Sequence, residues 1–160
     1  MASKGGDRGR PRAGDRRKPA LILLIPSQTS FLSLVRDLTK RMAEVAGFDQ
    51  GAPDRIALAV DEATTNAIEH AYHGAPDREV ELRFDEEGAE LKVEVADSGD
   101  SIDPRLMPRV DLERYASERR RGGLGVHLMG RIMDSVTFRR SARRNVCCLV
   151  KRKNAGSSRA

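Results

Sequence analysis

Three polar side chains recur four positions apart in one stretch of the sequence: Glu62, Asn66 and His70. Carboxylate and imidazole groups can exchange protons, and an amide can both donate and accept hydrogen bonds. On a helix this spacing places the three groups along one flank of an apolar stripe. The stripe consists of Ile56, Val60, Ala63, Ala67 and Ala71. A packing helix would more simply carry Leu or Lys at such a border, because a half-buried carboxylate needs partners. A solvated helix face explains the spacing equally well.

Two further stretches combine glycine with groups that can bind a ligand. Asp97-Ser98-Gly99 follows an alternating apolar run, although an acidic residue and glycine at a strand exit are also ordinary turn chemistry. The other stretch is Arg121-Gly122-Gly123-Leu124-Gly125-Val126-His127-Leu128. Here glycines lead into a helix, whose free N–H groups and positive dipole end can bind a phosphate. Each motif alone is weak.

The elements that must position these residues are readable from periodicity. Alternating or continuous apolar runs predict five strands. They span Leu21–Ile25, Val80–Phe84, Leu91–Val95, Val136–Arg140 and Val146–Lys151. Helical spacing predicts a first helix from Ser30 to Gly47, capped by Thr29 or Ser30. A central helix with Pro53 in its first turn follows, and a third begins after the glycines.

The composition indicates one soluble domain with basic tails. The chain has 160 residues, 39% of them hydrophobic, and a net charge of +5. Residues 1–19 carry seven Lys/Arg and two Asp, residues 151–160 carry four Lys/Arg, and the rest carries 18 basic and 22 acidic groups. We therefore expect disordered tails at 1–19 and 153–160 around a domain at 20–152, with no dedicated nucleic-acid face. The longest apolar run is far too short for a membrane span, which favours a cytoplasmic protein.

The segment from Ile102 to Arg121 is polar and contains six arginines and two prolines. Its length without a core pattern predicts a mobile loop or lid. The adjacent cysteines, Cys147 and Cys148, would point to opposite faces of a strand, so a structural disulfide is not expected.

The order of the motifs resembles a known family. Glu-x-x-x-Asn on a helix, Asp-x-Gly after a strand, an arginine-rich lid and Gly-Gly-x-Gly before a helix look like the GHKL ATP-binding superfamily. One segment is similar in sequence to the bacterial anti-sigma factor serine/threonine kinases of the RsbW type: Asp61-Glu62-Ala63-Thr64-Thr65-Asn66-Ala67-Ile68-Glu69-His70-Ala71-Tyr72. The likeness covers about residues 20–152. It implies an α+β fold, a two-layer sandwich with three helices on one face of a mostly antiparallel sheet.

The resemblance also implies roles for individual residues. Glu62 would be the general base, and Asn66 would bind Mg²⁺. Asp97 would accept a hydrogen bond from the adenine amino group of ATP, and Gly99 would let the nucleotide approach the backbone. Phosphate contacts would come from Gly123, Leu124, Gly125, Val126, His127 and Leu128, with Arg121 or its neighbours Arg119 and Arg120 closing over them. His70 would contact the nucleotide, or be a structural histidine.

The implied function is a bifunctional switch in transcription regulation. The protein would sequester a sigma factor and transfer phosphate to a serine or threonine of a STAS-type anti-anti-sigma protein, and it would be a homodimer. Ser101 and the turn Ala142–Asn145, which lacks Gly-Thr, depart from the superfamily pattern and leave the adenine contacts there open. The rivals are an ATP- or ADP-binding module without transferase activity, a histidine kinase catalytic domain, and a nucleic-acid binder acting through the tail.

Overall fold

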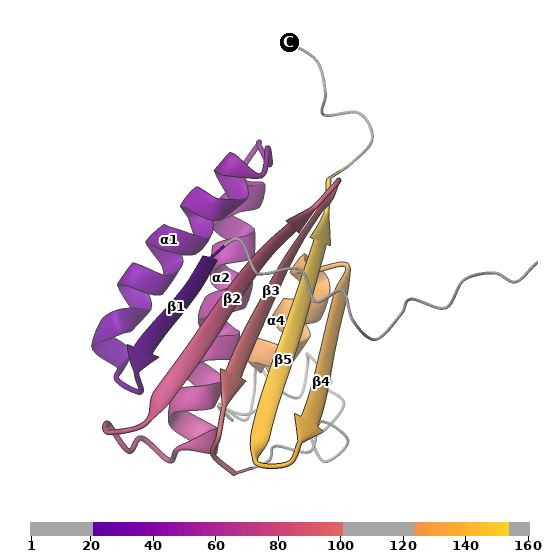
Figure 1. Ribbon diagram of the computed structural model, residues 1–160. Coiled ribbons are helices and arrows are strands. Elements are labelled where there is room, and N and C mark those ends of the chain that lie inside the picture. Colours follow the sequence, from indigo (N-terminus) through magenta and orange to yellow (C-terminus); the bar gives the residue numbers. More distant parts are fainter. Residues whose placement is uncertain (1–20, 101–123, 154–160) are drawn as a thin grey trace, which may run out of the picture.

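A five-stranded antiparallel sheet is the framework of the protein (Figure 1). The computed structural model describes residues 21–100 and 124–153. The strands are β1 (Leu21–Pro26), β2 (Glu79–Glu87), β3 (Glu90–Asp97), β4 (Ser135–Ser141) and β5 (Arg144–Arg152). Their order across the sheet is β1-β2-β3-β5-β4, and every described pairing is antiparallel. All five predicted strands are confirmed.

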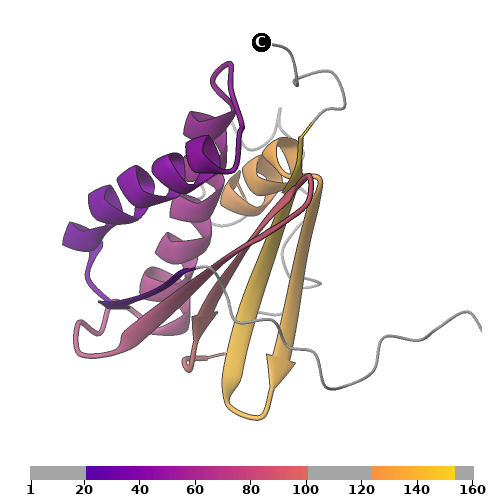
Figure 2. The ribbon, with the colours of Figure 1, turned by 45° about the horizontal axis from the view of Figure 1, so that its top comes forward.

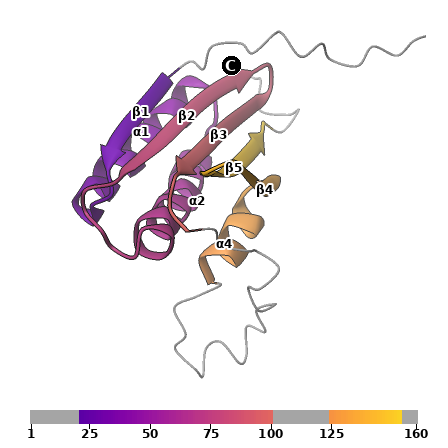
Figure 3. The ribbon, with the colours of Figure 1, turned by 60° about the horizontal axis from the view of Figure 1, so that its bottom comes forward.

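The helices cover one face of this sheet, and the described part of the other face carries none (Figures 2 and 3). A 3₁₀ turn, η1 (Thr29–Phe31), leads into α1 (Leu32–Val45). Helix α2 (Ala52–Asn66) continues into the π-helical segment η2 (Ala67–Ala71), and α4 (Leu124–Ile132) follows later in the chain. Helix α2 packs between α1 and α4 and also contacts β3. The two-layer sandwich is therefore confirmed, with α2 at its centre.

The core forms where the alternating strand residues meet the helix stripe. Val93 on β3 faces Phe84 on β2 and Leu149 on β5, and all three side chains are fully buried. From α2, Ile56 and Val60 pack into the same cluster. This period-two burial is what an antiparallel sheet with one covered face requires.

The ends of the helices follow the predicted turn residues in part. Gly47 adopts φ +86°, a conformation that favours glycine, and its N–H donates to the carbonyl of Glu44. Pro53 lies in the first turn of α2, as predicted. Neither Thr29 nor Ser30 caps α1, however. Both residues form the 3₁₀ turn that precedes the helix, and the N-cap position is Phe31, without a side-chain hydrogen bond.

The sheet face without helices carries acid-centred ion pairs. Glu94 contacts Lys92 at 2.8 Å and Arg139 at 2.6 Å, while Glu81 contacts Arg83 and Arg144. Lys92 and Arg83 lie on the same strand as the acid that they contact, whereas Arg139 on β4 and Arg144 on β5 each reach an acid two strands away. Both cysteines on β5 are free, which agrees with the expectation of no disulfide.

The described residues include one residue of the predicted C-terminal tail. Lys153, the first residue of the predicted C-terminal tail, donates through its N–H to the carbonyl of Ala89 and through Nζ to that of Ala46. Ordered contacts thus reach one residue beyond residue 152. The rest of both predicted tails and the predicted lid at 102–121 lie outside the described residues. Within residues 21–100 and 124–153, none of the helices is long and apolar enough to span a membrane.

Candidate functional site

Glu62 belongs to α2, and its half-buried side chain points towards the start of α4. A Cβ atom added to Gly125 would come within 2.4 Å of Glu62 Oε2. The carboxylate therefore occupies the space that a side chain at position 125 would fill. Helix α4 begins one residue earlier, at Leu124, so the carboxyl group of Glu62 lies beside the first turn of that helix.

The surroundings of Glu62 favour its neutral form. Burial raises the pKa of the Glu62 carboxyl, and the charges of Asp61 and Glu69 raise it further. Burial likewise raises the pKa of Asp61, whose nearest cation is Arg36 on α1, with Nε 3.7 Å from Oδ1. A carboxylate whose pKa is raised towards neutral pH is suited to take up a proton.

Asn66 and His70 are separated by a change in helix type. Asn66 is the last residue of α2, is half-buried, and makes no side-chain hydrogen bond within the described part of the chain. From Ala67 to Ala71 the helix is π-helical, with the N–H of Tyr72 donating to the carbonyl of Ala67. A π-turn holds more residues than an α-turn, so it rotates the following side chains off the α-helical wheel. His70 is exposed instead of lying on the flank with Glu62 and Asn66.

Asp97 is the last residue of β3, and one of its two carboxylate oxygens is fully engaged. Oδ1 accepts hydrogen bonds from the N–H of Gly99 at 2.9 Å and from Nδ2 of Asn145 at 2.7 Å. Burial raises the pKa of Asp97, although these two hydrogen bonds and the charges of Arg140 and Arg144 act in the opposite direction. Asn145 gives no signal in the sequence, because its turn lacks the Gly-Thr of many relatives and nothing else there indicates a role.

Gly99 packs against the end of the central helix. A Cβ atom there would lie 2.2 Å from the carbonyl oxygen of Ala71 and 2.9 Å from Cδ1 of Tyr72. The next residue, Asp100, donates its N–H to that same carbonyl at 2.8 Å. The absent side chain thus lets the exit of β3 approach the end of η2, which is a packing requirement in addition to the predicted approach of the nucleotide.

Tyr72 is a second residue that sequence reasoning missed. Its hydroxyl donates to the carbonyl of Glu79 at 2.7 Å and accepts from the N–H of Ser98 at 2.7 Å. The side chain therefore joins the end of η2 to the start of β2 and to the exit of β3. An aromatic residue after an apolar stripe gives no sequence signal for such a bridge.

The glycine-rich stretch is described only in its second half. Leu124 is exposed, whereas Gly125, Val126, His127 and Leu128 are half-buried in the first turns of α4. Arg121 and Gly123 lie outside the described residues, as do Arg119 and Arg120. The N-terminal part of α4 lies against Glu62, so the first and third sequence motifs meet in space.

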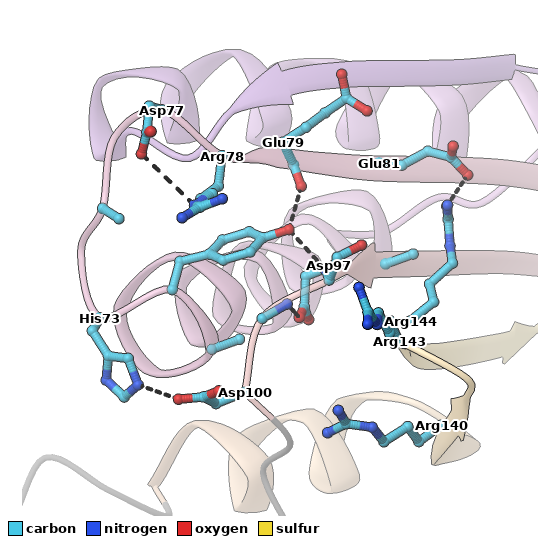
Figure 4. Close-up of a pocket in the computed structure, with 16 residues that line it drawn as sticks. His73, Asp77, Arg78, Glu79, Glu81, Asp97, Asp100, Arg140, Arg143 and Arg144 are labelled. Carbon is cyan, nitrogen blue, oxygen red and sulfur yellow. Dashed lines mark hydrogen bonds and ion pairs between the residues drawn. The ribbon is translucent and has the colours of Figure 1, made fainter.

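A cavity of about 690 Å³ opens at the end of the sheet where β3 exits (Figure 4). Asp97 and Gly99 line it, together with Tyr72 and with Arg140, Arg143 and Arg144 from the β4–β5 hairpin. Glu62 and Asn66 are not among the described residues that line it. The two halves of the predicted site are thus both built around the α2–η2 helix, one on its flank against α4 and the other at its end.

Comparison with known proteins gives one consistent result. Residues 25–151 match the histidine kinase-like ATPase domain family. The serine-protein kinase RsbW of Bacillus subtilis is 34% identical over 70% of this chain and 72% of its own length. RsbW of Bacillus velezensis is 35% identical over 70% of this chain and 72% of its own length. RsbW of Listeria monocytogenes is 32% identical over 72% of this chain and 76% of its own length. The residues that match the family include the central helix, the β3 exit and the start of α4.

Proposed function

Since the chain belongs to the histidine kinase-like ATPase domain family, we propose that it is an ATP-dependent serine/threonine protein kinase acting as an anti-sigma factor. Its substrate would be a STAS-type anti-anti-sigma protein, and its second partner a sigma factor. The observation that carries the proposal is the pairing of Glu62 with Gly125, which puts a carboxylate of raised pKa beside the first turn of α4. The similarity to proteins named serine-protein kinase supports the same reading.

Glu62 is the base in this proposal. Its carboxylate would accept the proton of the substrate hydroxyl as that oxygen attacks the γ-phosphorus of ATP, while the bond from this phosphorus to the β,γ-bridging oxygen breaks and ADP leaves. Burial raises the pKa of Glu62, so it holds a proton better than an exposed carboxylate does. The N–H groups at the start of α4 would face the phosphates, because the first N–H groups of a helix have no partner within it.

The adenine ring of ATP would lie at Asp97, and its amino group would donate a hydrogen bond to the carboxylate. Asp97 is half-buried at the cavity and has an oxygen left over from its contacts to Gly99 and Asn145. A half-buried carboxylate selects a ligand that carries a hydrogen-bond donor, because a ligand with an acceptor at that position would leave the carboxylate unpaired. This chemistry distinguishes adenine from a 6-oxo purine.

Asn66 is the residue that we propose as the Mg²⁺ ligand. Its half-buried amide makes no side-chain hydrogen bond within the described residues, and amide oxygens suit this hard cation. Mg²⁺ commonly uses one or two protein ligands with the remaining positions taken by phosphate and water, so one amide fits. An ion held there would offset the negative charge of the phosphates.

The direct test is phosphotransfer to a protein. Purified full-length chain is incubated with Mg²⁺, γ-labelled ATP and each candidate STAS-type protein from the same cell. We expect label on one serine or threonine, lost when that residue is changed to alanine. ATP binding without labelling of any candidate would replace the kinase with a binding module. Sigma-factor capture is tested by pull-down from the native cell in ATP and in ADP, with nucleotide-dependent recovery expected.

We further propose that the protein is a cytoplasmic homodimer that buries part of the sheet face without helices. Ile22 and Leu24 on β1 are 50% and 53% exposed there, and β1 is an edge strand of the described sheet. Adjacent exposed apolar side chains on an edge strand favour pairing with another chain.

Leu24→Lys is expected to shift the protein from dimer to monomer, because it places a charge in the apolar patch. Light scattering of the wild type should give about twice the 17.7 kDa chain mass, and the variant should give the single mass. Val45→Lys is the matched control, since Val45 is 63% exposed on α1, away from this face. If Leu24→Lys dimerised as strongly as the wild type, the interface would have to lie elsewhere.

A further inference from the structure

Asn145 is the second residue of β5, and its side chain contacts the exit of β3. Its Nδ2 lies 2.7 Å from Asp97 Oδ1, 3.1 Å from the carbonyl oxygen of Gly99 and 3.2 Å from that of Asp100. All three neighbours are acceptors, so the amide must present its nitrogen to them. The two hydrogens of that nitrogen are fully used: one satisfies the carboxylate and the other is shared by the carbonyl groups.

These contacts divide the Asp97 carboxylate into two unlike oxygens. Oδ1 accepts from Asn145 and from the N–H of Gly99. Oδ2 receives no hydrogen bond or ion pair from residues 21–100 or 124–153. Partial rotation of the carboxylate would break both hydrogen bonds, so Asn145 and Gly99 together fix its orientation and leave one oxygen free. Asn145 does this with a side chain, and so it is open to substitution.

We propose that Asn145 is a positioning residue that presents Oδ2 of Asp97 to the purine and thereby sets the preference for a 6-amino over a 6-oxo base. The inference rests on the proposed use of ATP and adds a residue that the resemblance left without a role. A carboxylate held with one oxygen towards the ligand accepts from an amino group and repels a carbonyl oxygen. A freely rotating or protonated carboxyl group would lose this discrimination.

The groups around Asp97 determine the pKa of its carboxyl group and hence how ATP binding depends on pH. Arg140 on β4 and Arg144 on β5 favour the ionised form, as does the donation from Asn145, whereas burial favours the neutral form and raises the pKa. On the helix side the carboxylate interacts with Tyr72, and on β5 it interacts with Cys147. Removal of Asn145 takes away a contribution that lowers the pKa of Asp97, so the carboxyl group should protonate at higher pH.

The test compares equilibrium binding of ATP and of inosine triphosphate to the wild type and to Asn145→Leu, which is close in volume but has no donor. We expect the Kd for ATP to rise by about 10-fold to 100-fold, the loss typical of a hydrogen bond to a charged group. The Kd for inosine triphosphate should stay within about 3-fold, because that base gains nothing from the ordered carboxylate. The loss of ATP binding at acid pH should begin at higher pH in the variant.

Two further variants make the result specific. Asn145→Ser retains one donor, so its preference for ATP should lie between those of the wild type and the leucine variant. This also keeps the test valid if Asn145→Leu fails to fold by circular dichroism. Ser141→Leu is the matched control on the same hairpin, where the side chain is exposed, and it should leave both Kd values unchanged.

Equal losses of affinity for the two nucleotides in both Asn145 variants would overturn this inference and assign Asn145 a purely structural role, while the kinase proposal would stand. A wild-type protein that binds neither nucleotide with Mg²⁺ present would overturn both. Selective loss of ATP binding, with the acid limb moved upward, would establish the positioning role.

Discussion

Glu62→Gln is expected to lower kcat for phosphotransfer by about 100-fold to 10,000-fold, the range that a general base contributes. Glutamine has nearly the same shape and keeps the contact with Gly125, but it cannot take up the proton of the attacking hydroxyl group. Binding of ATP should change by less than about 3-fold, because the phosphates are held by other groups. Transfer and binding are measured separately, by single-turnover labelling and by equilibrium titration.

The pH profile of the wild type gives the same prediction a second readout. Glu62 must be ionised to act, so activity should fall as the pH drops through its pKa, which burial and the charges of Asp61 and Glu69 hold above the ordinary value. Glu69→Gln is the matched control: Glu69 is exposed, and removing its charge should keep kcat while moving the acid limb to lower pH. Undiminished transfer by Glu62→Gln would refute the base assignment.

The sheet and the central helix were predictable because their sequences obey a single periodicity. Val80, Leu82 and Phe84 alternate with polar residues, and in the structure these three are fully buried on one face. A strand buried on one side cannot slip by one residue without exposing its whole core face. The apolar stripe from Ile56 to Ala67 likewise packs into the core as its spacing predicts.

The end of the central helix was not predictable in the same way. The wheel assumed one continuous α-helix, but the segment from Ala67 to Ala71 is π-helical, so His70 turns to solvent. The cause lies in tertiary contacts that a wheel does not contain. The carbonyl of Ala71 accepts from Asp100, and the Tyr72 hydroxyl joins Glu79 to Ser98. A helix end fixed at several points by a neighbouring strand can adopt a backbone that no local pattern favours.

The candidate site shows the same division. Glu62, Asn66 and Asp97 could be selected because acids and amides at helix borders and strand exits carry recognisable chemistry. Asn145 could not, because its partners are 45 to 48 positions away in the sequence. The register of β3 against β5, which pairs Asp97 with Asn145, creates that contact. Register across a sheet is fixed by the whole core and not by either residue.

Gly125→Ala is expected to lower kcat by about 100-fold, close to the effect of misplacing a catalytic group by about 1 Å. The new Cβ would lie 2.4 Å from Glu62 Oε2, so the carboxylate must move away from the start of α4. Glu62 can rotate, and Ala favours helix over Gly by about 1 kcal/mol, so the fold should not be weakened. Because the backbone N–H of residue 125 remains, the Kd for ATP should change less than kcat.

Gly130→Ala in the same helix separates the catalytic effect from the helical one. Nothing lies within 4 Å of a Cβ atom at Gly130, so this variant gains the same helix propensity without touching Glu62. Its melting temperature should rise by roughly 2–4 °C with kcat unchanged. If Gly125→Ala transferred phosphate as fast as Gly130→Ala, the position of Glu62 against α4 would have no bearing on catalysis. If it lost transfer while melting no lower than the wild type, the missing side chain at 125 would be a requirement of the reaction and not of the fold.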